Sequence, residues 1–261
     1  IMKEFKKIEI KALKSFSDLK LNVVKQVNVG TVNRNKEVDK HLNSLFDYIN
    51  RNQDINMVGV SKDEDVLLSS QVKSSENKKK IYTFPEPNPV CIYYNIANEN
   101  LEKSAKLKFS IISKEQNFDA FEDFNKFSQY YSFTSQGIIF LITTVEAFIN
   151  QFFEEKDYQI GEEILTKKDL EFSNLEEKLN VIIPELLGIR FSKLYNDEYQ
   201  CLINSNLLRN DLIHLKRTDK TNNTSYQELF KKLIDYKHHR CSEAVYKLLI
   251  TLKPNYFKME K

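Results

Sequence analysis

Large apolar residues recur at helical spacing in the second half of the chain. In the clearest segment they follow one another at steps of three and four positions: Ile138, Leu141, Val145, Phe148 and Phe152. This spacing places side chains on one face of an α-helix, so we expect a helix that buries this face in a core. On its other side Thr143, Glu146 and Asn150 form a polar line, which we expect to face the polar motif described below.

Similar periodicity continues through residues 114–261, where apolar stripes alternate with short polar stretches. Gly137 marks either a break or a close packing point. Ser173 with Glu176 is typical of a capping box that starts a further helix, and the apolar residues of Leu229–Leu252 indicate a long closing helix. The pattern predicts a mainly α protein in which residues 114–261 form a bundle of four or five helices.

Residues 1–113 have a different pattern of apolar and polar residues. Short runs that are typical of β-strands occur at four places: Lys6–Ile10, Leu19–Val29, Val90–Ile96 and Leu107–Ile112. Glu37–Ile49 has helical spacing, whereas the polar and basic segment Ser69–Lys80 has no periodicity and predicts an exposed loop. We therefore expect a smaller N-terminal α+β module over residues 1–113, followed by the helical domain.

Composition supports the helical prediction. The chain of 261 residues has five Gly, five Pro and no Trp, which favours long helices over a turn-rich β architecture. Its apolar content of 41% is enough for a buried core. The 39 basic and 37 acidic residues leave a net charge of only +2, so no global positive field marks the chain as a nucleic-acid binder. Any such site must be local.

Neither the cysteines nor the longest uncharged run indicates a secreted or membrane protein. Cys91, Cys201 and Cys241 are an odd, widely spaced set without a C-x-x-C pair, which argues against a disulfide framework and a zinc site. The run from Phe127 to Val145 has an apolar part roughly half as long as a membrane span requires. We therefore expect a buried helix there, no contact with a membrane, and a cytoplasmic protein.

The segment Leu207–Leu215 (LLRNDLIHL) places polar residues inside an apolar helical pattern. Arg209, Asn210, Asp211 and His214 lie among leucines that form one stripe. Histidine suits proton transfer near neutral pH, and the donors of arginine match phosphate oxygens. This combination makes the segment the candidate functional site.

Arg209-Asn210-x-x-x-His214 resembles the R-x4-6-H motif of HEPN (higher eukaryotes and prokaryotes nucleotide-binding) domains. Residues 144–150 (TVEAFIN) resemble the Glu-bearing helix that precedes this motif in many such domains, and residues 176–179 (EEKL) fall in the intervening helix. The likeness covers about residues 115–252. It implies a HEPN-like helical bundle and metal-independent cleavage of RNA to 2′,3′-cyclic phosphate ends.

The resemblance also implies roles for the site residues. His214 would transfer the proton, and Arg209 would contact the phosphate or the negative charge of the transition state. Asn210 would orient the phosphate or His214, and Glu146 would hold Arg209. The predicted catalytic residues are Arg209, His214, Asn210 and Glu146, and the predicted RNA-binding residues are Asn150, Lys216 and Arg217. No metal or cofactor is expected, because no His-x3-His or carboxylate cluster is present.

The spacing of the motif raises a geometrical difficulty. Five residues on an ideal helix turn through about 500°, so Arg209 and His214 lie about 140° apart. Three arrangements would bring them together: an irregular helix start near Arg209, an Arg side chain that wraps round the helix, or two subunits that combine their motifs. The third is common in HEPN proteins, so the resemblance implies a homodimer with an isologous interface.

A structural role for the motif is the competing interpretation. Arg209 can simply pair with Glu146, and Asp211 can be a surface charge. Asn210 and His214 can hydrogen-bond across helices. Two functional hypotheses therefore remain. In the first, the protein cleaves RNA as a toxin or as an effector of anti-phage or stress defence, and an antitoxin or regulatory protein is a further partner. In the second, it is a non-catalytic module that dimerises, assembles with a partner protein or binds a nucleotide.

Two further histidines, His238 and His239, lie in the charged stretch Lys237–Arg240. Neighbouring residues on a helix point apart and the stretch is polar, so both side chains are predicted to be solvated. They are therefore not assigned to the candidate site.

Overall fold

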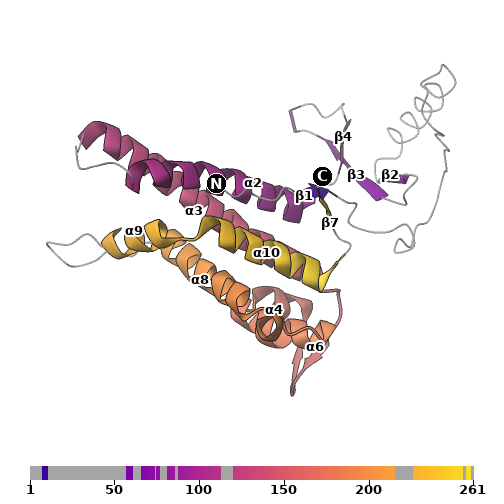
Figure 1. Cartoon of the computed structure of the whole chain (residues 1–261). Coiled ribbons are helices and arrows are strands. Elements are labelled where there is room, and N and C mark those ends of the chain that lie inside the picture. Colours follow the sequence, from indigo (N-terminus) through magenta and orange to yellow (C-terminus); the bar gives the residue numbers. More distant parts are fainter. Residues whose placement is uncertain are drawn as a thin grey trace. The chain divides into compact units, whose positions relative to one another are not determined.

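Figure 1 shows the computed structural model, which describes residues 8–10, 57–60, 66–73, 75–76, 81–85, 88–112, 120–214, 226–254 and 257–259. This part of the chain is mainly helical, which confirms the predicted fold class. The chain divides into two compact units, one formed by Lys11–Asn88 and the other by Ile1–Ile10 with Pro89–Lys261. The first unit contains a sheet and the second a helical bundle.

The smaller unit has three antiparallel strands in the order β2 (Met57–Val60), β3 (Val66–Lys73) and β4 (Ile81–Pro85). Ser69 of β3 pairs with Met57 on one side and with Pro85 on the other, so β3 is the central strand. The loop predicted for Ser69–Lys80 is therefore wrong over Ser69–Lys73. Backbone pairing with a strand holds this polar segment extended although its side chains show no period.

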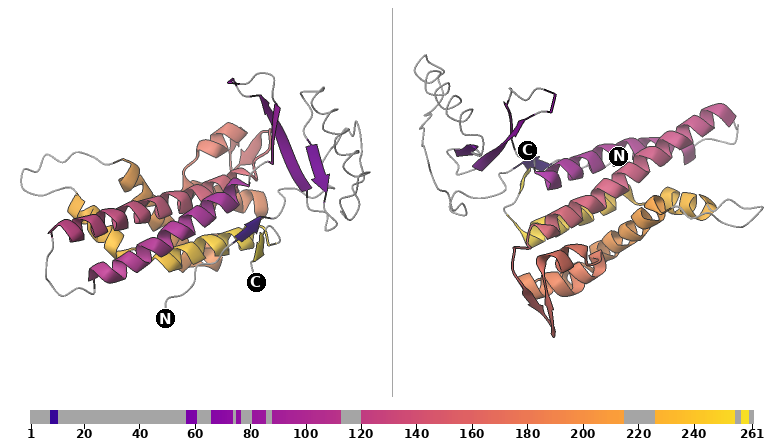
Figure 2. Two further views of the ribbon diagram at one scale, coloured as in Figure 1. Left: turned by 90° about the horizontal axis from the view of Figure 1, so that it is seen from above. Right: turned by 180° about the vertical axis from the view of Figure 1, so that it is seen from behind.

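The larger unit contains these elements in chain order: β1 (Ile8–Ile10), α2 (Pro89–Ile112), α3 (Ala120–Asn150), β5 (Tyr158–Ile160), β6 (Glu163–Leu165), α4 (Lys167–Phe172), α5 (Leu175–Glu177), η2 (Lys178–Ile182), α6 (Ile183–Leu187), α7 (Phe191–Leu194), α8 (Asn196–Ile213), α9 (Tyr226–Asp235), α10 (His238–Leu252) and β7 (Phe257–Met259). The longest helices form the bundle: α3 packs against α2, α8 and α10, and α8 also packs against α10. Figure 2 shows α2 and α3 side by side and antiparallel.

Helix α2 corrects the strands predicted for Val90–Ile96 and Leu107–Ile112. Both segments belong to one helix, whose buried side chains include Val90, Cys91, Tyr94, Ala97, Leu101 and Ser104. Short apolar runs occur in buried helices as well as in strands, so periodicity over a few residues does not separate the two. Because α2 packs along α3, the units divide at Asn88 and Pro89 and not at the predicted residues 113 and 114.

Helix α3 buries the stripe that predicts it, including Ile138, Leu141, Val145 and Phe148. Gly137 lies inside the helix and is a close packing point, not a break. A Cβ atom there would lie 2.6 Å from Cδ2 and 3.3 Å from the backbone nitrogen of Leu101. By length and composition, the part Phe121–Asn150 is apolar enough to cross a membrane, but half of its most apolar window is buried inside the bundle. That burial is typical of a core helix.

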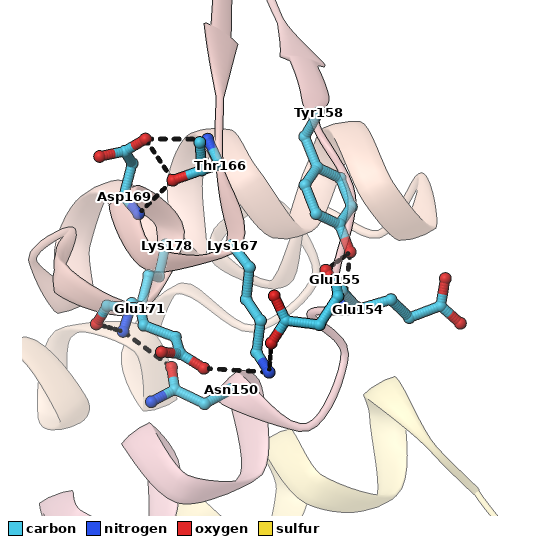
Figure 3. Close-up of polar contacts among 9 residues, drawn as sticks. All are labelled: Asn150, Glu154, Glu155, Tyr158, Thr166, Lys167, Asp169, Glu171 and Lys178. Atoms are coloured by element: carbon cyan, nitrogen blue, oxygen red, sulfur yellow. Dashed lines mark hydrogen bonds and ion pairs between the residues drawn. The ribbon is translucent and has the colours of Figure 1, made fainter.

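Short elements connect α3 to α8. The helix predicted to start with Ser173 and Glu176 is capped one residue later, where Oδ1 of Asn174 accepts the backbone N–H of Glu177 at 2.9 Å. Ser173 instead ends α4, whose own capping box appears in Figure 3. The next element, η2, is a π-helix. Such turns are rare and are frequent at functional sites.

Strand β1 is the last part of the strand predicted at Lys6–Ile10. It pairs antiparallel with β7, so the two ends of the described chain lie side by side in the larger unit. The strand predicted at Leu19–Val29 and the helix predicted at Glu37–Ile49 lie outside the described residues.

The predicted closing helix consists of α9 and α10, which are interrupted at Tyr236 and Lys237. His238 is therefore the first residue of α10. The next residue, His239, is partly exposed, and its Nδ1 lies 3.3 Å from Oε2 of Glu243. The two histidines therefore have different surroundings.

His238 is buried, so the prediction of a solvated side chain is wrong. It is 5% exposed, and its Nε2 lies 2.8 Å from Oγ of Ser104, which also hydrogen-bonds to Thr134. Burial lowers the pKa of His238 to about 4, the charge of Lys108 adds to the lowering, and a hydrogen bond with the backbone of Tyr236 opposes it. Because α10 begins at His238, the side chain of His238 lies against α2 and α3. The polar residues next to it in the sequence do not reveal this burial.

Candidate functional site

Arg209 lies near the end of α8 and contacts α3. Its Nη2 is 3.3 Å from Oε2 of Glu146, and its Nη1 donates to Oδ1 of Asn210 at 3.1 Å. The side chains of Arg209 and Glu146 are 25% and 32% exposed, so the ion pair is partly open to solvent. Of the polar line of α3, Glu146 contacts the motif, so the predicted contact between Glu146 and Arg209 is present. Thr143 instead donates a hydrogen bond to the backbone oxygen of Ile139 in its own helix.

Arg209 retains hydrogen-bond donors beyond these two contacts. A guanidinium has five N–H groups. The Nε atom is buried and has no acceptor among the residues that the structure describes. Buried polar atoms without partners are uncommon, and leaving one costs about 1–3 kcal/mol. The terminal nitrogens Nη1 and Nη2 have further N–H groups, and these can donate hydrogen bonds to phosphate oxygens.

Asn150, on the same polar line as Glu146, contacts a buried lysine. Nζ of Lys178 donates to Oδ1 of Asn150 at 2.9 Å and to the backbone oxygen of Glu171 at 2.7 Å. Figure 3 shows these contacts. Lys178 is 2% exposed. Burial lowers its pKa, and the negative charges of Glu146 and Glu171 oppose this lowering. Glu146 therefore interacts with two cations, Arg209 directly and Lys178 through its field.

Lys178 is absent from the predicted site residues, although its position carries a signal. With Leu175, Leu179 and Ile182 it occupies the i, i+3, i+4 and i+7 positions of one buried face. A charged residue on such a face needs a polar partner. The signal identifies the lysine, but only packing brings it to Asn150, because the two residues lie on different elements.

His214 is the residue that follows α8, and its side chain is exposed. Its backbone N–H donates to the carbonyl of Asn210 at 2.9 Å. Since α8 is helical from Asn196 to Ile213, an irregular helix start near Arg209 is not present. The Arg209 side chain extends to Glu146 and does not wrap towards His214. Neither of the two arrangements within one chain therefore occurs in the described residues.

The other predicted residues fall into three groups. Asp211 pairs with Lys232 on α9 at 2.7 Å, and both side chains are exposed, so Asp211 is a surface charge as the structural interpretation expects. Asn210 accepts its hydrogen bond from Arg209 on its own helix and not from another helix. Lys216 and Arg217 lie outside the described residues.

No group of three or more His, Cys, Asp or Glu side chains that could hold a metal ion occurs in the described part of the chain. A cavity of about 580 Å³ lies between α8, α9 and α10, but its lining does not include Arg209 or His214. Comparisons with protein-family models, with curated proteins and with solved structures found no match. The likeness to HEPN domains therefore rests on the motif and its surroundings.

Cleavage of RNA without a metal requires a base for the ribose 2′-OH, a cation for the charge at phosphorus and an acid for the leaving 5′ oxygen. Arg209 is the oriented cation, and His214 is the exposed imidazole. The two groups act on one phosphate only when both come within hydrogen-bond reach of it, about 3 Å. A single chain does not bring Arg209 and His214 into contact with each other in the described structure.

Proposed function

We propose that this protein is a metal-independent, HEPN-like endoribonuclease that leaves 2′,3′-cyclic phosphate ends. One observation carries the proposal: Arg209 is oriented by Glu146 and Asn210, while His214 is exposed at the end of the same helix. The pair also matches the order of the motif in the sequence.

In this proposal, His214 transfers the proton between the ribose 2′-OH and the leaving 5′ oxygen. Arg209 stays protonated and neutralises the charge that develops at phosphorus. Glu146 and Asn210 restrict the guanidinium to one orientation, so less side-chain entropy is lost when the phosphate binds. Lys178 holds Asn150, which together with Lys216 and Arg217 is proposed to contact the RNA.

A homodimer completes the proposed site. Arg209 and His214 lie about 140° apart on a regular helix. A two-fold axis that brings two copies of α8 together would place Arg209 of one protomer near His214 of the other. Each dimer would then contain two composite sites, and each protomer would supply one half of each.

We propose that the enzyme acts in the cytoplasm as a toxin or as an effector of stress or anti-phage defence. Uncontrolled cleavage of RNA damages the cell that makes the enzyme, so an antitoxin or regulatory protein partner belongs to the proposal. The smaller unit, with its three-stranded sheet, is the proposed position for this control.

Purified protein of residues 1–261 should be incubated with total RNA and EDTA, and the ends of the products analysed. Wild-type protein is expected to make cuts with 2′,3′-cyclic ends, whereas Arg209→Ala and His214→Ala should each lose roughly 100-fold or more of this activity. Asp211→Asn is the matched control on the same helix, and it should remain active because Asp211 contacts only a surface lysine among its described partners.

Mixing the two inactive variants tests the composite site. A dimer of one Arg209→Ala chain and one His214→Ala chain has one composite site with both groups and one with neither. Activity should therefore return on mixing and subunit exchange. Sites formed within single chains would stay inactive in the mixture, and this result would contradict the dimeric site.

The second candidate is a non-catalytic module that dimerises or binds a partner protein or a nucleotide. It is favoured by the existing ion pair of Arg209 with Glu146, which gives the arginine a structural role. Under this hypothesis, concentrated wild-type protein forms a folded dimer but cuts no RNA. Sedimentation and calorimetric titration with nucleotides would then show assembly or binding, and Arg209→Ala would reduce these properties instead of cleavage.

A further inference from the structure

Cys201 on α8 and Cys241 on α10 are far apart in the sequence but line the same cavity, whose volume is about 580 Å³. Helices α8 and α10 pack against each other, and each thiol shifts the pKa of the other. Both are free thiols in the structure. Cys241 is 4% exposed, and Cys201 is partly exposed. We call this pair, which lines the cavity, the dithiol.

The surroundings of the dithiol favour the loss of one proton. The hydrogen bond from Cys201 lowers the pKa of Cys241, and burial opposes this lowering. Hydrogen bonds with Ser205 and Tyr236 and the charge of Arg240 also favour the Cys241 thiolate. The same thiol contact raises the pKa of Cys201, and burial adds to the effect. The pKa of Cys241 is thus lowered and that of Cys201 raised, which favours Cys241 as the sulfur that reacts first.

Cys91 provides a contrast within the same chain. It is fully buried in α2, and burial raises its pKa to about 12. It does not line the cavity. A thiol of this kind is inert, because the thiolate is the reactive form.

We propose that Cys201 and Cys241 are a site of reversible oxidation, at which a hydroperoxide converts the dithiol into an intramolecular disulfide between α8 and α10. The thiolate attacks one oxygen of the hydroperoxide, the O–O bond breaks, and a sulfenic acid forms as water or an alcohol leaves. The second thiol then attacks the sulfenic sulfur, so that the S–S bond forms and the S–O bond breaks with release of water. Two thiols lose two electrons, and the hydroperoxide gains them.

The cross-link joins α8 to α10 about two helical turns before Arg209. Since α8 carries Arg209 and precedes His214, the disulfide restrains the helix of the proposed site. Thiol exchange with a reductant reverses the reaction. The inference does not depend on the proposed RNA cleavage, because its test counts thiols and needs no RNA.

Folded protein of residues 1–261 should be treated with hydrogen peroxide, denatured, alkylated with a maleimide and digested with trypsin. We expect the number of alkylated cysteines to fall from three to one. Mass spectrometry should find peptides 194–209 and 241–247 joined, with a mass two hydrogen atoms below their sum. Peptide 81–103, which contains Cys91, should remain alkylated, and dithiothreitol should restore all three thiols.

Three variants complete the test. Cys201→Ser and Cys241→Ser should form no intramolecular disulfide, whereas Cys91→Ser is the matched control and should form it as wild type does. Three alkylated cysteines after peroxide treatment, sulfinic acid without a cross-link, or a disulfide between two chains would each overturn the proposal. If a serine variant of the dithiol fails to fold, the comparison of wild type with Cys91→Ser still shows whether the disulfide forms, because both proteins keep the dithiol.

Discussion

The helical unit should lose stability in mild acid because His238 is buried as a neutral imidazole. Its pKa is lowered from 6.5 to about 4, chiefly by burial, with the charge of Lys108 acting in the same direction. Between these values the unfolded chain binds a proton that the folded chain excludes, so the free energy of unfolding falls as the pH decreases from about 6.5 towards 4. At 1.36 kcal/mol for each pKa unit, the full loss is about 3 kcal/mol, and about 2 kcal/mol is lost at pH 5.

Replacing His238 by glutamine removes the titrating group and keeps a side chain that can hydrogen-bond to Ser104. Guanidinium unfolding followed by far-UV circular dichroism should be compared at pH 7 and pH 5. Wild type is expected to lose about 2 kcal/mol more than His238→Gln over this interval. His239→Gln controls for the loss of one histidine and, because it keeps His238, should lose as much as wild type. Equal losses in wild type and His238→Gln would refute the reasoning.

Three further substitutions test packing and the candidate site. Gly137→Ala should destabilise the protein by about 1–3 kcal/mol in urea unfolding, because its Cβ would lie 2.6 Å from a side-chain carbon of Leu101; an unchanged midpoint would contradict this close contact. Lys178→Ala should cost about 1–3 kcal/mol by the same measurement, because Asn150 and a backbone carbonyl lose their donor. Glu146→Gln should slow RNA cleavage by roughly tenfold without changing the circular dichroism spectrum, and full activity would show that the ion pair does not orient the motif arginine.

Helix α3 could be predicted from the sequence because its apolar period extends over many turns. A long stripe of buried side chains is a local property of the chain, so it needs no knowledge of the neighbouring helices. The prediction of strands within α2 was wrong for the opposite reason. Residues 90–96 and 107–112 are short apolar runs, and such runs fit either kind of element until the helix that packs on them is known.

The candidate site was predictable in part. The spacing of Glu146 and Asn150 on one helix predicted a polar face, and the structure brings Arg209 to that face. The buried Lys178 required the packing of η2 on α3 before its partner could be known. For His214, the sequence of one chain does not reveal the residue that acts with it. His214 is exposed at the end of α8, and under the proposed function its partner is Arg209 of a second chain.

The sequence by itself determined the mainly helical class, the apolar faces and the residues of the Arg-Asn-His motif. Only the tertiary structure decided that His238 lies inside the bundle, that Lys178 meets Asn150 and that Cys201 and Cys241 line one cavity. The physical reason is that helical periodicity belongs to the backbone, so it is visible in a few turns of sequence. Burial, hydrogen-bond partners and pKa values depend on groups within a few ångströms, and packing brings those groups from distant parts of the chain.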